Sequence, residues 1–385
     1  MTRSLLPALA LLAVFSAAPL LGAKVQLEPV SSEDGGPVWA GKQFVAADKA
    51  GNVFFFRSET LEVYPLSKDG SLGAPVRLKT AGSPVGEVHD VALSPDGRRW
   101  LVQTIRGVRL FEAGKEKVLP ALAWRPVAVG FRRDVPVVAT IAIPVQSIPD
   151  PSKVGRLPWL QELSGDEWST LVERDGPPFS ELVKRENWFG EALEEDPLAL
   201  AADRRGRLWV ARRHAYNVQE FNPGGRLLST ILMDQGRVRK KKESQGIEIK
   251  RSDPAGNPRE ATRNPATEKA TFYPFVAEKV IHDLVEGRDG RMYFLVVPRA
   301  GTAALDRFDP VRAVLERINI PLKADSGDFV AMAAGKDGLY FASTDPKQGR
   351  WMVTWEALDA AGWKEVEGAT LDGLENAPPE PARGN

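Results

Sequence analysis

The sequence predicts an all-β protein, a six-bladed β-propeller with two long loop insertions, and a recurring segment is the main reason. Clear copies of this segment span residues 89–102 and 282–295, and looser copies span 198–211 and 330–342. Each copy reads as a small apolar strand, an Asp-Gly type turn and an aromatic-rich strand, which is the pattern of a β-hairpin. A hairpin that returns about every forty to fifty residues indicates a radial repeat protein.

Six units can be placed along the chain, each with an inner strand, a turn, a second strand and an outer hairpin. They lie near residues 39–78, 87–122, 127–172, 196–231, 282–320 and 329–366. Aromatic and β-branched residues fill these segments, which favours strands over helices. The third unit lacks the Asp-Gly turn, and a long insertion has room for another unit, so seven blades remain an alternative.

A ring of such units leaves only short, protected sheet edges. We expect the alternating segment Lys24–Val30 to complete the sixth unit and so to join the first blade to the last. Within the sixth unit we expect an outer hairpin formed by Met352–Glu356 and Trp363–Val366.

Two insertions interrupt the repeats, at Pro144–Leu157 and Gln235–Lys269, and a short helix is expected over Ser180–Leu193. Loops of this length within a compact fold are usually functional or disordered. The second insertion begins with the basic run Arg237–Lys242, which is either a solvated loop or a contact for an anionic partner.

The composition excludes several classes of function. The 385 residues carry 51 basic and 51 acidic side chains, so no net charge draws the chain to nucleic acid, and we expect no nucleic-acid partner. Because the chain has no cysteine, thiolate nucleophiles and cysteine-ligated zinc or iron–sulfur centres are excluded. No phosphate-binding glycine loop, serine nucleophile elbow or His-Glu-x-x-His helix is found.

The N-terminus has the pattern of a secretory signal peptide. Arg3 precedes an apolar run over Leu5–Leu21, and the small residues Gly22 and Ala23 follow. We therefore expect a signal peptide at 1–23, a propeller at 24–371 and a disordered tail at 372–385. This organisation predicts a secreted or periplasmic monomer with no membrane span after cleavage, and an uncleaved membrane anchor is the alternative.

The repeat resembles a known family. The pattern His89-Asp-Val-Ala followed by Asp96-Gly97 and Trp100, together with the later segment Asn217–Gly225, is similar to the NHL-type repeat of six-bladed β-propellers. The resemblance covers most of the chain after residue 23. It implies the fold rather than one activity, because propellers of this type have binding, scaffolding and enzymatic roles.

Two of the six units carry a His-Asp pair immediately before the inner strand, His89-Asp90 and His282-Asp283, although the chain has only 3 histidines. The two pairs belong to the second and fifth units, which face each other across a six-membered ring. Glu87, Asp196 and Asp328 are expected near the same mouth of the channel. Imidazoles beside carboxylates suit a divalent metal, with His89 and His282 as the candidate ligands, and they also suit acid–base chemistry near neutral pH.

The resemblance adds a specific alternative. Some NHL-type enzymes, such as the peptidyl-hydroxyglycine lyases, hold zinc with histidines from the inner strands of separate blades, and His89 and His282 stand at comparable positions. A third inner-strand histidine is missing, because His214 follows the second strand of its unit. A purely structural role also fits, in which the His or Asp hydrogen-bonds the backbone of the neighbouring blade.

The function expected from the sequence is an exported binding module. Its ligand, a small molecule, peptide or glycan, would lie at the mouth of the channel among His89, Asp90, Asp196, His282, Asp283 and Asp328. A metal-dependent lyase or hydrolase at the same residues is the first alternative. A scaffold protein of the cell envelope, with an envelope protein as its partner and the basic loop at 235–269 as its contact, is the second.

Overall fold

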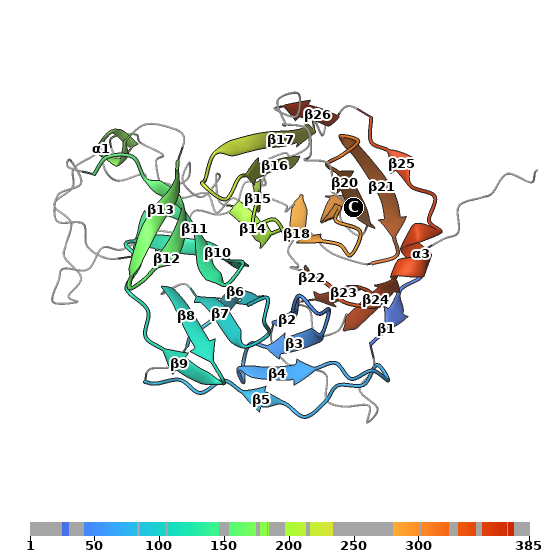
Figure 1. Ribbon diagram of the computed structural model, residues 1–385, viewed down its shortest axis with the longest axis horizontal. Helices are drawn as coiled ribbons and strands as arrows, with labels where there is room; N and C mark the ends of the chain where they lie inside the picture. The colour runs from blue at the N-terminus through green and yellow to red at the C-terminus, as the bar shows by residue number, and fades with distance from the viewer. Residues whose placement is uncertain are drawn as a thin grey trace, which may run out of the picture.

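The chain forms six antiparallel sheets arranged as blades around a central axis, a six-bladed β-propeller (Figure 1). The six blades confirm the expected fold. The computed structural model describes residues 25–30, 42–82, 85–104, 107–145, 154–174, 178–182, 184, 197–212, 216–233, 280–299, 302–322, 330–343, 349–367 and 369–372.

The first three blades follow one another along the chain and have four strands each. Blade one contains β2 (Gln43–Ala47), β3 (Val53–Arg57), β4 (Glu62–Pro65) and β5 (Val76–Arg77). Blade two contains β6 (Val88–Leu93), β7 (Arg99–Thr104), β8 (Gly107–Glu112) and β9 (Lys115–Lys117). Blade three contains β10 (Trp124–Arg132), β11 (Val135–Pro144), β12 (Pro158–Ser164) and β13 (Glu167–Glu173).

The other three blades also use strands from the two ends of the chain. Blade four contains β14 (Pro197–Ala202), β15 (Leu208–Arg212), β16 (Tyr216–Phe221), β17 (Leu227–Met233) and β26 (Ala369–Asp372). Blade five contains β18 (Ile281–Glu286), β19 (Met292–Arg299), β20 (Thr302–Asp309), β21 (Val314–Ile320) and β25 (Lys364–Glu365). Blade six contains β22 (Val330–Ala334), β23 (Gly338–Ser343), β24 (Arg350–Thr354) and β1 (Glu28–Pro29).

Turn chemistry sets the repeated hairpin of each blade. In blade one, Asp48 Oδ1 accepts hydrogen bonds from the backbone N–H groups of Ala50 and Asn52, both at 2.9 Å, which fixes the turn between β2 and β3. Gly51 and Gly97 follow at equivalent turns with φ of 81° and 73°, a region that favours glycine. The Asp-Gly signals in the sequence therefore mark turns.

The apolar core lies between the faces of neighbouring blades. Trp100 of blade two stacks on Phe56 of blade one at 5.8 Å between ring centroids, and Trp209 of blade four lies 5.9 Å from Phe308 of blade five. Each of these side chains is buried. Burying one large apolar side chain stabilises a fold by about 1.5–3 kcal/mol, so each aromatic pair ties two blades together.

The N-terminal strand closes the ring, as the sequence predicted. Glu28 of β1 pairs with Met352 of β24, and the Val30 N–H donates to the Arg350 carbonyl at 3.0 Å. Val25 is buried in the same apolar cluster as Trp355. Blade six is therefore built from both ends of the propeller sequence.

The outer hairpin predicted for blade six is wrong. The third strand β24 ends at Thr354, whose side chain caps the helix α3 (Trp355–Asp359) by accepting from the Ala357 N–H at 3.2 Å. Because β1 occupies the outer edge of blade six, the segment around Lys364–Glu365 has no edge to pair with there. It pairs instead with Glu316 and Arg317 of blade five.

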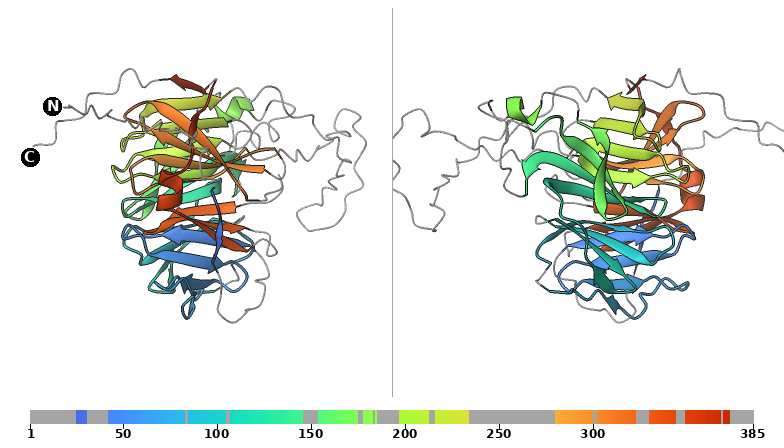
Figure 2. Two further views of the ribbon diagram at one scale, coloured as in Figure 1. Left: turned by 90° about the vertical axis from the view of Figure 1, so that its right-hand side faces the viewer. Right: turned by 60° about the vertical axis from the view of Figure 1, so that its left-hand side comes forward.

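The C-terminal part of the chain then continues along the outer surface of the ring. Strand β25 adds to β21 in blade five, and β26 adds to β17 in blade four, where Thr230 pairs with Asp372 and Met233 with Ala369 (Figures 1 and 2). Two blades therefore have five strands instead of the four that the sequence predicts. Asp372, which was assigned to the tail, is the last residue of β26.

The predicted insertions lie mostly outside the described residues. The helix expected over Ser180–Leu193 is represented by the four-residue α1 (Phe179–Leu182), whose Phe179 and Leu182 are buried. The predicted signal peptide at 1–23, the basic loop at 235–269 and the tail after Asp372 are not among the described residues. None of the helices in the described ranges is long and apolar enough to cross a membrane.

Candidate ligand site in the central channel

The two His-Asp pairs lie on the innermost strands of opposite blades, β6 in blade two and β18 in blade five (Figure 1). In both strands the pairing with the next strand shifts register at the histidine. The shift falls between Val88 and Asp90 in β6, and between Ile281 and Asp283 in β18. A β-bulge at such a position redirects a side chain and is frequent next to functional sites.

The two carboxylates make the same contacts in their two blades. Asp90 accepts from the N–H of Val91 at 2.9 Å and from the N–H of Val129 in blade three at 2.8 Å. Asp283 accepts from the N–H of Leu284 at 2.8 Å and from the N–H of Met332 in blade six at 2.6 Å. Each carboxylate therefore links its own inner strand to that of the next blade. This is the bond expected if the His-Asp pairs have a structural role.

Burial changes the acidity of both carboxyl groups. Burial raises the pKa of Asp90 to about 8, the bond from Val129 opposes this rise, and the nearby charge of Asp283 adds to it. Burial also raises the pKa of Asp283 to about 7, opposed by the bonds from Met332 and Leu284. Because the charge of Asp283 acts on Asp90, the two groups share one electrostatic environment across the channel. At neutral pH this environment disfavours two full negative charges.

The histidines differ in exposure. His282 is fully buried, whereas His89 is partly exposed. Next to His89, Glu87 pairs with Lys42 of blade one, with 2.7 Å between Nζ and Oε1. The bond from Lys42 lowers the pKa of Glu87, and the charge of His89 adds to this effect. This region therefore combines two half-buried carboxyls, the partly exposed His89 and an exposed ion pair, whereas His282 is fully enclosed.

Two more residues predicted for the site, Asp196 and Asp328, lie outside the described residues, and so does His214, which was not predicted to belong to it. Among the residues that are described, no group of three or more His, Asp and Glu side chains has the proximity that a metal ion requires. Both oxygens of Asp90 and of Asp283 also accept backbone N–H bonds. The described side chains therefore do not by themselves complete a divalent-metal site.

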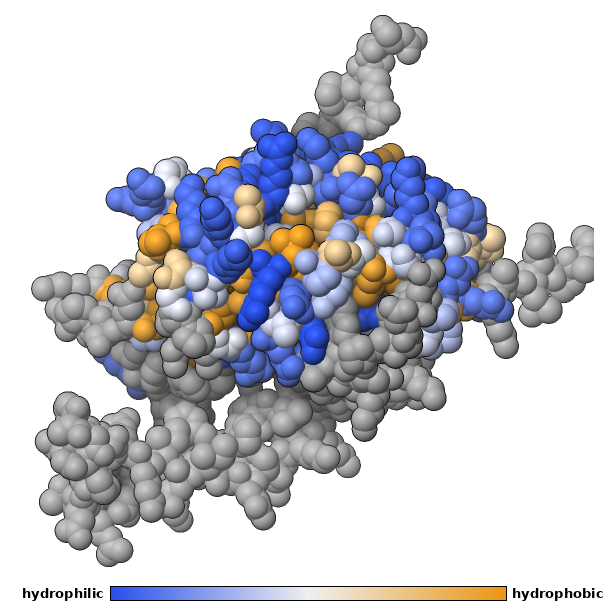
Figure 3. Space-filling model, turned by 90° about the horizontal axis from the view of Figure 1, so that it is seen from below, coloured by the Kyte–Doolittle hydropathy of each residue, from blue (hydrophilic) through white to orange (hydrophobic). Residues whose placement is uncertain are grey.

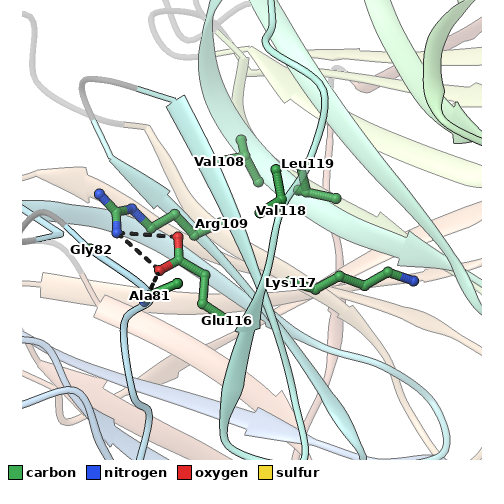
Figure 4. A pocket seen from close by; sticks show the side chains of 8 residues that line it. All are labelled: Ala81, Gly82, Val108, Arg109, Glu116, Lys117, Val118 and Leu119. Carbon is green, nitrogen blue, oxygen red and sulfur yellow. Dashed lines mark hydrogen bonds and ion pairs between the residues drawn. The ribbon is translucent and has the colours of Figure 1, made fainter.

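A second concave feature lies on the outer rim of blade two. This hollow of about 340 Å³ is lined by Ala81, Gly82, Val108, Arg109, Glu116, Lys117, Val118 and Leu119 (Figure 4). Glu116 accepts from Arg109 Nη1 at 3.2 and 3.3 Å and from the Ala81 N–H at 2.7 Å. The sequence pattern gave no sign of this ion pair, whose residues lie on either side of the turn at Ala113 and Gly114.

The rim around this hollow mixes apolar and charged groups. Figure 3 shows the molecule from the lower side of Figure 1, with small hydrophobic areas between hydrophilic side chains. Val76 is 55% exposed and Val118 is 85% exposed. Scattered apolar residues of this kind are normal on a protein surface. The channel, where ionisable groups converge, is therefore the stronger candidate site.

Comparisons with known proteins give similarity in structure only. No family model matches the sequence, and no curated protein matches it. A streptogramin B lyase structure is 12% identical with a TM-score of 0.46, covering 84% of this chain and 96% of that one. The structure of U3-55K is 12% identical with a TM-score of 0.46, covering 90% and 97%.

A hydrazine synthase of Kuenenia stuttgartiensis is 10% identical with a TM-score of 0.44, covering 84% of this chain and 77% of that one. Similarity at this level carries no argument about family or activity, since one fold hosts many functions. What the molecule itself shows is a six-bladed β-propeller whose opposite blades two and five each carry a His-Asp pair on their innermost strand.

Proposed function

We propose that this protein is an exported binding module that holds a ligand at the mouth of its central channel. One observation carries the proposal: Asp90 and Asp283, from opposite blades, interact electrostatically and have pKa values near neutrality. Ionisable groups with strongly shifted pKa values in a concave site are typical of functional sites. The ligand class is a small molecule, peptide or glycan.

The electrostatics favour a ligand with a basic or hydrogen-bond-donating group. A positive charge placed between Asp90 and Asp283 stabilises their charged forms and so lowers the pKa values that burial raises, and binding therefore releases protons. A ligand that carries only acceptors can bind only the protonated carboxyls and forms no ion pair with them. Amino sugars, amines and N-terminal peptide amines are therefore the preferred candidates within the broader class.

The test is a thermal-shift screen followed by calorimetry. The screen uses defined probes: glucosamine and chitobiose, short peptides with free N-termini, spermidine, and their N-acetylated counterparts. We expect a basic probe to raise the melting temperature of the wild-type protein, and its acetylated counterpart to have no effect. Calorimetry in buffers of different ionisation enthalpy measures the proton release.

Matched variants decide where the probe binds. His89→Ala with His282→Ala should abolish the shift, whereas Glu116→Ala in the rim hollow should leave it unchanged. Equal shifts in all variants, or no shift with any probe, would contradict a channel ligand.

A metal-dependent lyase or hydrolase is the second candidate function. The observation that favours it is that His89 and His282 occupy the same bulge position on opposite inner strands. Metal analysis of purified protein tests it. Stoichiometric metal that is lost in the His89→Ala, His282→Ala double variant would support this candidate, and its absence from protein refolded with Zn²⁺, Mn²⁺ or Ca²⁺ would reject it.

A further inference from the structure

The outer edges of the six blades are protected in different ways. The outermost strands of blades one and six, β5 and β1, are only two residues long. In blade two the segment at Lys79 pairs with Lys115, and the Glu116 N–H donates to the Lys79 carbonyl at 3.0 Å. In blades five and four, β25 and β26 cover the seven-residue strands β21 and β17.

Blade three is the exception. Its outermost strand β13 has seven residues, and within the described part of the chain its only sheet partner is β12. A long outer strand exposes a row of backbone N–H and C=O groups that can pair with another chain. Natural edges are commonly blocked by Lys or Pro, and β13 contains neither. Figure 1 shows β13 at the rim of its blade.

The N-terminal part of β13 is regular enough to pair with an added strand. Glu167, Trp168, Ser169 and Thr170 pair in continuous register with β12, and a register shift at Leu171 follows. The regular stretch is therefore four residues long. Strand β26 adds to β17 over four residues as well. The molecule itself thus shows that a stretch of this length is enough for strand addition.

Neighbouring blades hold β13 in place. The Trp168 indole N–H donates to the Pro120 carbonyl of blade two at 2.9 Å, and Trp168 packs against the apolar cluster there. On the other side, the Gly225 turn of blade four lies directly against the Leu171 carbonyl. A strand fixed before binding loses little conformational entropy when a partner is added.

The charges of the edge select the partner. Asp166 and Glu167 are exposed at the start of β13, whereas Glu173 at its end already pairs with Arg156, with 3.6 Å between Oε2 and Nη1. Two copies of this chain pairing antiparallel over Glu167–Thr170 would place Glu167 opposite Thr170, so self-pairing of this stretch gains no opposite-charge pair. A strand with Lys or Arg opposite Glu167 meets an opposite charge instead.

We propose that β13 is a docking strand that binds an extended, basic peptide segment of another protein by β-strand addition. Main-chain hydrogen bonds along Glu167–Thr170 provide the affinity, and the acidic groups select basic side chains. This site lies on the outer rim and is independent of the channel site in the proposed function.

The test uses a capped, fluorescently labelled hexapeptide, Thr-Lys-Val-Lys-Val-Thr, and its two alternately N-methylated forms. A strand presents the N–H groups of alternate residues to each side, so methylation of one set should weaken binding at least tenfold and methylation of the other should not. Fluorescence anisotropy measures the affinity. No saturable binding, or equal loss with both methylated peptides, would overturn the proposal.

Protein variants locate the site. Glu167→Lys should weaken binding about tenfold, whereas Glu112→Lys on the exposed end of β8 and Asp90→Asn in the channel should not. Unchanged affinity in Glu167→Lys would overturn the proposal. So would a concentration-dependent dimer, in sedimentation velocity, that Glu167→Lys alters, because it would assign the edge to self-association. Melting curves of each variant verify that it is folded.

Discussion

At the scale of single residues, Asp90 and Asp283 combine two properties that rarely occur together. Each accepts two backbone N–H bonds, which favours the charged carboxylate, and each is half-buried with a desolvated carboxyl group, which favours the neutral acid. Burial is the larger effect in both. The two groups therefore join blades mechanically while remaining able to take up a proton near neutral pH.

This acidity has a consequence for stability. The pKa of each carboxyl is higher in the folded protein than in the unfolded chain, where it is near 3.9, so the folded state binds protons more tightly. The free energy of unfolding should therefore fall as the pH rises from about 4 to about 8, at up to about 1.4 kcal/mol per pH unit for each carboxyl. Denaturant unfolding between pH 5 and pH 8 measures this slope.

The matched controls are Asp90→Asn with Asp283→Asn, and Asp96→Asn. The double variant should have a smaller slope. Asp96 lies on an exposed turn, and the Ser94 hydroxyl lowers its pKa, so its contribution is lost only below about pH 4. A double variant that keeps the wild-type slope would show that other groups cause it.

A second prediction at this scale concerns two glycines with positive φ. Gly225 has φ of 79°, and a Cβ added there would lie 2.0 Å from the Leu171 carbonyl oxygen. Gly165 has φ of 63°, and a Cβ added there would have no neighbouring atom within 4 Å. Gly165→Ala should cost about 1 kcal/mol from the backbone alone. Gly225→Ala should cost several times more because the turn must move away from β13. Denaturant unfolding separates the two, and equal costs would contradict the close contact.

At the scale of elements, the strands added after blade six change the outer surface of blades four and five. Trp363, directly before β25, contacts both α3 and blade five. Its indole N–H donates to the Leu358 carbonyl at 2.7 Å, and the Arg307 guanidinium lies 4.1 Å from the ring centroid. The sequence predicted a strand here correctly but in the wrong blade. A two-residue alternation identifies a strand and contains no information about which sheet edge is free.

Trp363 therefore provides a test of how much the added strands contribute. Trp363→Ala removes its packing against Tyr293, at 6.1 Å between centroids, and its cation–π contact with Arg307. We expect a loss of about 2–3 kcal/mol in the free energy of unfolding. Lys364→Ala, at an exposed position in β25, should change it by less than about 0.5 kcal/mol. Equal effects would mean that β25 is only loosely attached.

At the scale of the whole molecule, the ring is closed by β1, and much of this architecture was predictable. The repeated hairpins predicted the inner strands, and the alternation of Lys24–Val30 predicted the closing strand. A bond from each His-Asp pair to the neighbouring blade was one of the expected roles, but its partners, the N–H groups of Val129 and Met332, were not predictable. They depend on how neighbouring blades pack, and a repeat pattern does not describe contacts between blades.

Removal of the closing strand should affect the whole ring. A chain that starts at residue 31 lacks the pairing of Glu28 with Met352 and the buried side chain of Val25. It should unfold several degrees lower, by calorimetry, than a chain that starts at residue 24, because one face of blade six loses its cover. A chain that ends at residue 373 serves as the control and should match the full-length protein. Equal melting of all three would show that the ring closes without β1.

The same closing strand determines when the protein can finish folding. Glu28 is among the first propeller residues to be synthesised, and Met352 is among the last. Contacts between residues so distant in sequence form slowly. During translation the first five blades can assemble in order, but the ring cannot close until β24 has been synthesised. Strand β1 therefore remains without its partner β24 until that strand has been synthesised.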